Sequence, residues 1–171
     1  MVGWLEEVWR DGEGSALVEA VIVMPLLLGL FLGVFEFSWY FYNQQLVESG
    51  LRDAARYMAR IRLTDRNLDP CAQKDANGVL YTVDAANIAT TAQTAPAGVA
   101  RVRGWSAADV AISCLSSPAL KGGVYADGSA SMTIVYVATS FADPSLGFFS
   151  VLGLKPPLLS FAHQERFIGP G

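Results

Sequence analysis

The sequence has few of the residues that catalysis and metal binding usually require. It contains one histidine and two cysteines among 171 residues. The histidine, His163, stands beside Glu165 in a stretch that favours a strand, where a lone histidine is most often a surface residue. No GxSxG elbow, Walker loop, dinucleotide-binding glycine pattern or HExxH motif is present. We therefore expect no enzyme, no catalytic residue, no metal and no cofactor. A membrane-tethered enzyme based on His163 is the least favoured alternative.

Charge is also scarce. Only 16% of the residues are charged, and the net charge is -4. Phosphate binding needs Lys and Arg clustered on one basic face. This composition excludes nucleic acid as a partner, and nothing in the sequence indicates a small-molecule substrate.

Hydrophobic residues are abundant, at 52% of the chain, and many of them lie in residues 20–42. Residues 20–35 carry no charge and as a helix cover roughly 24 Å, short of the roughly 30 Å hydrocarbon core of a bilayer. The aromatic residues that follow, up to Tyr42, complete the length and suit the headgroup boundary. We predict one membrane-spanning helix. A cleaved secretory signal peptide is the disfavoured alternative, because a basic start and a small-x-small cleavage site are missing.

The two cysteines, Cys71 and Cys114, are too far apart for a Cys-x-x-Cys redox or zinc motif. A disulfide bond between them is the favoured interpretation, provided that this region lies outside the cytoplasm. Closing such a loop would stabilise the fold by roughly 4 kcal/mol. Two reduced, buried thiols are the alternative.

A short pattern precedes the apolar run. Gly14 is followed by Ser15, and a glutamate, Glu19, is the fifth residue counted from Ser15. With Pro25, Glu36 and the stretch LRDAARYMAR, residues 14–62 resemble the TadE-like pseudopilin family, and the C-terminal LSFAHQERFIGP resembles it more loosely. The resemblance implies that prepilin peptidase cuts between Gly14 and Ser15 on the cytoplasmic side. It also implies that Glu19 neutralises the new amine of an adjacent subunit.

By this resemblance the chain is a structural minor pilin or pseudopilin of a Tad-type pilus or of its initiation or secretion complex. Its partners would be the inner membrane, prepilin peptidase and other pilin subunits, with the head in the periplasm or in a surface pilus. The alternative is an uncleaved, signal-anchored periplasmic binding module. Acidic residues before the helix and arginines after it oppose the implied orientation under the positive-inside rule. We follow the resemblance, because the spacing of glycine and glutamate is specific.

Small residues inside the apolar run suggest helix packing. Gly29 and Gly33 form a small-xxx-small face, which also arises by chance in apolar helices. Pro25 removes a helix hydrogen bond and should kink or locally unwind the helix. It is either part of the subunit packing or simply tolerated in the membrane.

Helical spacing continues from Asn43 to about Arg62. The arginines there form an i, i+4 ladder, Arg52, Arg56 and Arg60, and pairs of Glu48 with Arg52 and of Asp53 with Arg56 are expected. Such a ladder is most often a solvated face. Contacts with subunits or with anionic lipid are the alternative.

The rest of the chain predicts a small α+β head. A polar loop at residues 65–70 ends the helix. After it, a short strand is expected from the alternation of Val79, Tyr81 and Val83. Residues 85–94 then suggest a helix that Pro96 ends. Three further strands are expected at residues 109–115, with Val110, Ile112 and Cys114 on one face, at 131–141, with Met132, Ile134 and Tyr136, and at 158–168. The apolar stretch 145–157 is either a subunit-binding patch or a short helix on the core.

The predicted fold is thus α+β and pilin-like. It has a long N-terminal transmembrane helix that continues as a stem and packs against a small antiparallel sheet. The expected domains are a cytoplasmic leader at residues 1–14, the transmembrane and stem helix at 15–62, and an extracytoplasmic head at 63–171.

Overall fold

The computed structural model describes residues 12–63, 68–117, 132–145, 147, 149, 153 and 155–168. The chain divides into two compact units, Met1–Tyr40 and Phe41–Gly171. Most of the predicted leader, part of the predicted polar loop and much of the stretch 145–157 lie outside the described residues.

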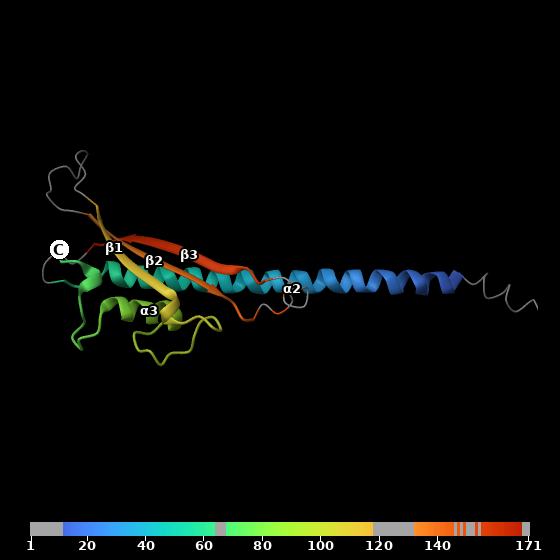
Figure 1. Cartoon of the computed structure of the whole chain (residues 1–171), viewed down its shortest axis with the longest axis horizontal. Coiled ribbons are helices and arrows are strands. Elements are labelled where there is room, and N and C mark those ends of the chain that lie inside the picture. Colours follow the sequence, from blue (N-terminus) through green and yellow to red (C-terminus); the bar gives the residue numbers. More distant parts are fainter. Residues whose placement is uncertain are drawn as a thin grey trace, which may run out of the picture. The chain divides into compact units, whose positions relative to one another are not determined.

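Helix α2, Gly12–Ala59, is the longest element, with 48 residues (Figure 1). It continues through Pro25 without a break in the assigned helix. Its end falls at Ala59, a few residues before the expected Arg62, and Arg60 closes the last turn with a bond from its N–H to the Tyr57 carbonyl at 3.2 Å. The predicted long N-terminal helix is confirmed.

The second unit contains a three-stranded antiparallel sheet in the order β1-β2-β3. The strands are β1, Val110–Ser117, β2, Met132–Ala142, and β3, Leu158–Arg166 (Figure 1). All three were predicted, and the α+β class is confirmed. The face of β2 that the sequence indicated, with Ile134 and Tyr136, is only half-buried. The buried residues are Val135 and Val137, on the opposite face of the strand.

The core of the second unit forms where the C-terminal part of α2, helix α3 and the sheet supply fully buried apolar side chains. From α2 come Val47, Leu51, Ala54, Ala55 and Met58; from α3, Ala85 and Ala89; and from the sheet, Val135, Val137 and Leu159. Trp105 joins them at 2% exposure, stacks on Phe141 and donates from Nε1 to Thr139 Oγ1 at 3.0 Å. Small residues on both helices allow them to pack closely.

Helix α3, Tyr81–Thr91, replaces the short strand expected at Val79, Tyr81 and Val83. That prediction was wrong: the chain makes only an isolated bridge between Lys74 and Leu80 before it turns into the helix. The β propensity of Tyr81 and Val83 is overridden because the helix buries the alanines that follow them. The helix also begins and ends earlier than the expected 85–94, with Ala92 at φ 62° forming a left-handed cap.

A polar cluster fixes the start of the second unit. Asn43 and Asp143 are almost completely buried, and Asn43 Nδ2 donates to the Asp143 carboxylate at 2.5 Å. Asp143 Oδ1 also accepts from the backbone N–H of Ser145 at 2.8 Å. The buried charge is therefore held by several donors, which offset the cost of removing it from water.

Gly50 marks the closest approach of α2 to α3. A Cβ atom at Gly50 would lie 2.3 Å from the Ala89 carbonyl oxygen and 2.8 Å from the Trp105 ring. Gly50→Ala should therefore force the helices apart and lower the free energy of unfolding by about 1–3 kcal/mol or more. Thermal unfolding of the full chain in detergent measures this. Gly29→Ala is the matched control, because a Cβ there meets nothing within 4 Å; equal melting temperatures for the two variants would contradict the packing.

Candidate processing and membrane-packing segment

The predicted cleavage position lies near the start of α2. Gly14 is exposed, and a Cβ atom built on it meets nothing within 4 Å. The backbone here is helical and not extended as expected for a scissile position, because the helix runs back to Gly12. Two glycines in the first turn each cost roughly 1 kcal/mol of helix stability relative to alanine. The turn can thus unwind for a protease at little cost.

Glu19 lies one turn into the helix after Ser15, on a stretch of exposed apolar side chains. Leu17, Val18, Val21 and Ile22 around it are 63–71% exposed. Among the residues that the structure describes, no cation forms an ion pair with Glu19. A carboxylate in an apolar environment is expensive without a partner. Glu19 is therefore an acid on an otherwise apolar stretch, without an ion-pair partner among the described residues.

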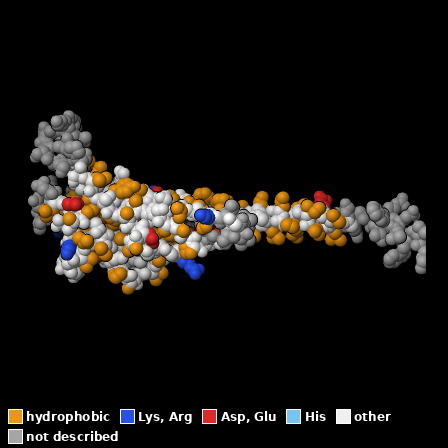
Figure 2. Space-filling view, viewed as in Figure 1, with side chains coloured by type: hydrophobic (Ala, Val, Ile, Leu, Met, Phe, Trp, Pro, Cys, Tyr) orange, Lys and Arg blue, Asp and Glu red, His pale blue; other side chains and the backbone are white. Residues whose placement is uncertain are grey.

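The first part of α2 exposes an apolar surface to its surroundings. Within the described residues, α2 is the one helix long and apolar enough to cross a membrane. Gly29 and Gly33 lie on this surface, and a Cβ atom at either meets nothing within 4 Å. Hydrophobic side chains dominate the extended stretch of helix on the face drawn in Figure 2. Such a surface is stable in lipid or against other apolar helices.

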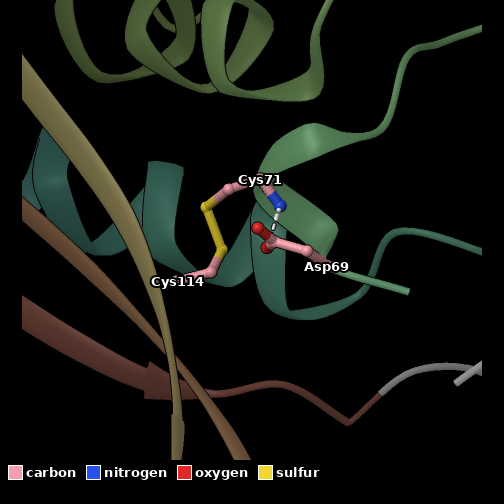
Figure 3. A group of neighbouring side chains, drawn as sticks. All are labelled: Asp69, Cys71 and Cys114. Atoms are coloured by element: carbon pink, nitrogen blue, oxygen red, sulfur yellow. Dashed lines mark hydrogen bonds between the residues drawn. A yellow bond between two sulfur atoms is a disulfide. The ribbon is translucent and has the colours of Figure 1, made fainter. Parts of the chain in front are cut away.

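Cys71 and Cys114 form a disulfide bond, with their Cα atoms 5.7 Å apart (Figure 3). It joins the short 3-10 helix η1, Pro70–Ala72, to strand β1. The Asp69 carboxylate lies close to both sulfurs but accepts the backbone N–H of Cys71 at 2.9 Å. Bonded sulfurs are not thiolates, so this group is a covalent link with a capped turn and not a metal site.

The second unit also contains an acidic turn. Hydrogen bonds to the Asp75 carboxylate, chiefly from the Val79 backbone N–H at 2.8 Å, lower the pKa of Asp75. Burial raises the pKa of Asp84, and the charge of Asp75 adds to that effect. The Tyr57 hydroxyl donates to Asp84 Oδ2 at 3.4 Å, a long contact. These carboxylates serve the turn and the contact of α3 with α2.

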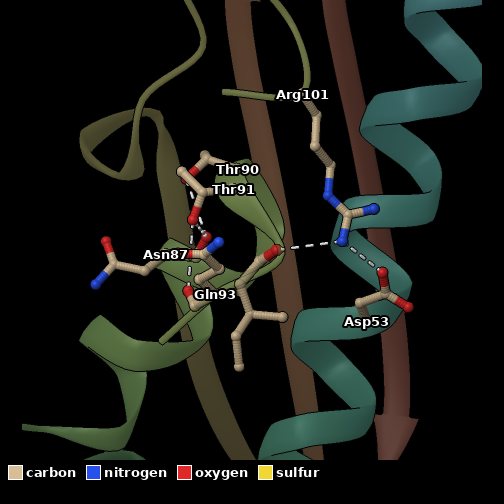
Figure 4. Close-up of polar contacts among 7 residues, drawn as sticks. Asp53, Asn87, Thr90, Thr91, Gln93 and Arg101 are labelled. Carbon is tan, nitrogen blue, oxygen red and sulfur yellow. Dashed lines mark hydrogen bonds and ion pairs between the residues drawn. The ribbon is translucent and has the colours of Figure 1, made fainter. Parts of the chain in front are cut away.

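Of the two ion pairs predicted along α2, one is present and one is not. Arg52 pairs with Glu48, as predicted. Asp53 does not pair with Arg56: it accepts Arg101 Nη2 at 2.6 Å, and the same nitrogen lies 3.4 Å from the Ile88 carbonyl (Figure 4). The Asp53–Arg56 prediction was wrong because a residue 48 positions away in the sequence competes for the carboxylate. No local pattern indicates that partner.

His163 and Glu165 lie side by side on β3. Their closest side-chain atoms, Nε2 and Oε2, are 3.4 Å apart, and both side chains are about one-third exposed. No described residue completes a nucleophile or metal site around them. The pair is an ordinary contact along a strand.

A single apolar N-terminal helix followed by a small α+β unit with an antiparallel sheet defines a membrane-anchored, pilin-like protein. Residues 14–56 match the family model described as TadE-like protein. This N-terminal segment is therefore similar to that of TadE-like proteins, the family that the sequence indicated. Neither the curated proteins nor the solved structures contain a match to the chain. The matched segment ends at Arg56, inside α2, so the sheet and α3 lie beyond it.

Proposed function

We propose that this chain is a structural minor pilin or pseudopilin. It enters the inner membrane as a precursor, prepilin peptidase removes residues 1–14, and the mature chain assembles into a Tad-type pilus or its initiation or secretion complex. The observation that carries this proposal is the position of Gly14, Ser15 and Glu19 at the start of one exposed apolar helix within the TadE-like match.

Cleavage after Gly14 would give the Glu19 carboxylate a role. Cleavage after Gly14 creates an ammonium group at Ser15. A carboxylate near the positive end of the helix is stabilised by the helix dipole, and it can neutralise the ammonium of an adjacent subunit. This pairing would supply the cation that Glu19 lacks among the described residues.

The apolar surface of α2 would pack against neighbouring subunits. Gly29 and Gly33 leave room for another helix to approach closely, since nothing occupies the space where their side chains would be. Pro25, which cannot donate a helix hydrogen bond, lies inside the same helix, where neighbouring subunits could contact it. The membrane-spanning helix thus becomes the filament core after extraction from lipid.

The disulfide favours a periplasmic location for the head. Disulfide bonds persist in oxidising compartments and are rare in the cytoplasm, and Cys71 is bonded to Cys114. With the head outside, residues 1–14 face the cytoplasm, where prepilin peptidase acts on its substrates. The uncleaved, signal-anchored binding module shares this orientation but keeps its leader.

Co-expression with a prepilin peptidase tests the proposal. The intact mass of the membrane-purified chain should correspond to a start at Ser15. Gly14→Val places a β-branched side chain at the scissile position and should leave only the full-length precursor, because the peptidase can no longer approach the backbone closely. Gly12→Val is the matched control and should still be cut. An intact leader on the wild-type chain contradicts the proposal and favours the uncleaved module.

A further inference from the structure

Three arginines, one in the last turn of α2 and two just after its end, line an open groove of about 570 Å³ in the second unit. They are Arg56, Arg60 and Arg62, and all three are exposed. Among the described residues, none of the three forms an ion pair, whereas Arg52 and Arg101 each have a carboxylate partner. Positive charge is thus concentrated in one place on a chain whose net charge is -4.

Among the described residues, one acidic residue lines this groove, and it is paired with another arginine. Asp53 binds Arg101 at 2.6 Å, and Arg101 is itself largely buried with 18% side-chain exposure. Asp53 is therefore already paired through one of its carboxylate oxygens. The three arginines supply positive charge to the groove, whereas the Asp84 carboxylate accepts a hydrogen bond from the Tyr57 hydroxyl at 3.4 Å.

The wall of the groove is apolar and aromatic. Tyr57 and Tyr81 lie with their ring centroids 6.3 Å apart, and Ile61 and Ile88 complete the surface between α2 and α3. The volume falls in the range of about 300–1,000 Å³ typical of ligand clefts. A ligand for this groove combines a negative charge with apolar groups.

The main chain at the start of α3 lacks a feature that phosphate sites usually have. Phosphate sites usually use free N–H groups at a helix N-terminus. Here the N–H groups of Tyr81, Val83 and Asp84 at the start of α3 already bind the carbonyls of Gln73 and Leu80. The remaining donors at the groove are the guanidinium groups, whose planar forks bind a carboxylate, as they do a phosphate, through two parallel hydrogen bonds.

We propose that this arginine groove binds a carboxylate-bearing segment of a neighbouring pilin subunit, with an acidic side chain held by Arg56 and Arg60 and an adjacent apolar side chain against Tyr57 and Tyr81. The proposal rests on the proposed function for the nature of the partner. In this proposal Arg56 and Arg60, which have no ion-pair partner among the described residues, make contacts between subunits. Arginines on a merely solvated surface would make no such contacts.

A defined peptide tests the groove on the purified full-length chain in an uncharged detergent. The probe is an acetylated Leu-Glu-Glu-Leu peptide with an uncharged fluorophore, and fluorescence anisotropy measures binding. We expect saturable binding that weakens with added salt. The matched Leu-Gln-Gln-Leu peptide should bind at least about tenfold more weakly, since each charge-assisted hydrogen bond contributes roughly 1.5–3 kcal/mol.

Variants locate the binding on the protein. Arg56→Gln combined with Arg60→Gln should weaken binding of the glutamate peptide at least about tenfold. Arg52→Gln is the matched control, because Arg52 is on the same helix and already pairs with Glu48; it should change binding less than about twofold. If the double variant does not fold, Arg62→Gln alone should still weaken binding.

Several results would overturn the inference: no saturable binding, equal binding of both peptides, or full binding by the double variant. Displacement of the peptide by phosphatidylglycerol micelles or inorganic phosphate, but not by acetate, would also overturn it and indicate a phosphate site. The intact mass of the same preparation reports processing separately. Failure of the groove therefore leaves cleavage at Gly14 unaffected, and an uncleaved leader leaves peptide binding unaffected.

Discussion

Replacing both cysteines, Cys71→Ser with Cys114→Ser, should lower the free energy of unfolding of the second unit by about 4 kcal/mol. The bond closes a loop between positions 43 residues apart, which greatly restricts the unfolded chain. It also ties η1, which precedes α3, to the edge strand β1. Because the strand has neighbours on one side only, this link replaces the support that a further strand would give.

Thermal unfolding of the full chain in detergent measures the effect, and the melting temperature should fall on the order of 10 °C. The wild-type chain with a reducing agent should unfold like the double variant. Asp69→Ala is the control near the same site, because it removes only the acceptor of the Cys71 N–H; it should cost about 1 kcal/mol. A double variant as stable as the oxidised wild type would show that the bond does not support the fold.

Replacing the acid near the start of the helix, Glu19→Gln, should prevent assembly while leaving cleavage intact. The proposed scissile bond precedes Ser15, so the peptidase should still produce the mature chain. The new ammonium of an adjacent subunit would then face a neutral amide in an apolar environment, and an unpaired charge there costs several kcal/mol. The amount of the chain in sheared surface filaments should fall at least about tenfold.

Glu48→Gln provides the control for this prediction. Glu48 is an acid on the same helix, but it pairs with Arg52 on the surface of the second unit. Its loss should leave both cleavage and filament content near the wild-type level, as expected for an exposed pair. Equal filament content for Glu19→Gln and the wild type would show that the Glu19 charge has no part in assembly.

The sequence predicted most of the elements because their patterns are local. The uncharged run before Phe35 indicates α2, and alternating apolar residues indicate β1, β2 and β3. It failed at Tyr81 and Val83, where alternation favoured a strand but burial of the following alanines against α2 stabilises a helix. It also indicated the wrong set of alternate residues on β2, because Ile134 and Val135 are both β-branched and only packing distinguishes them.

The two candidate sites differ in how far sequence could reveal them. The segment from Gly14 to Glu19 is contiguous, so its resemblance to TadE-like proteins could be seen in the sequence. The arginine groove depends on α3 lying beside α2 and on Arg101 occupying Asp53, contacts between residues distant in the sequence. The close approach at Gly50 likewise depends on the Ala89 carbonyl, which no local pattern places there.

The N-terminal residue of the chain in sheared surface filaments and in inner membranes of the native cell tests the account most directly. N-terminal sequencing should give Ser15 as the first residue in the filament fraction, with precursor that starts at Met1 confined to the membrane. A chain that starts at Met1 in every fraction, in cells that process their other pilins, would contradict the account.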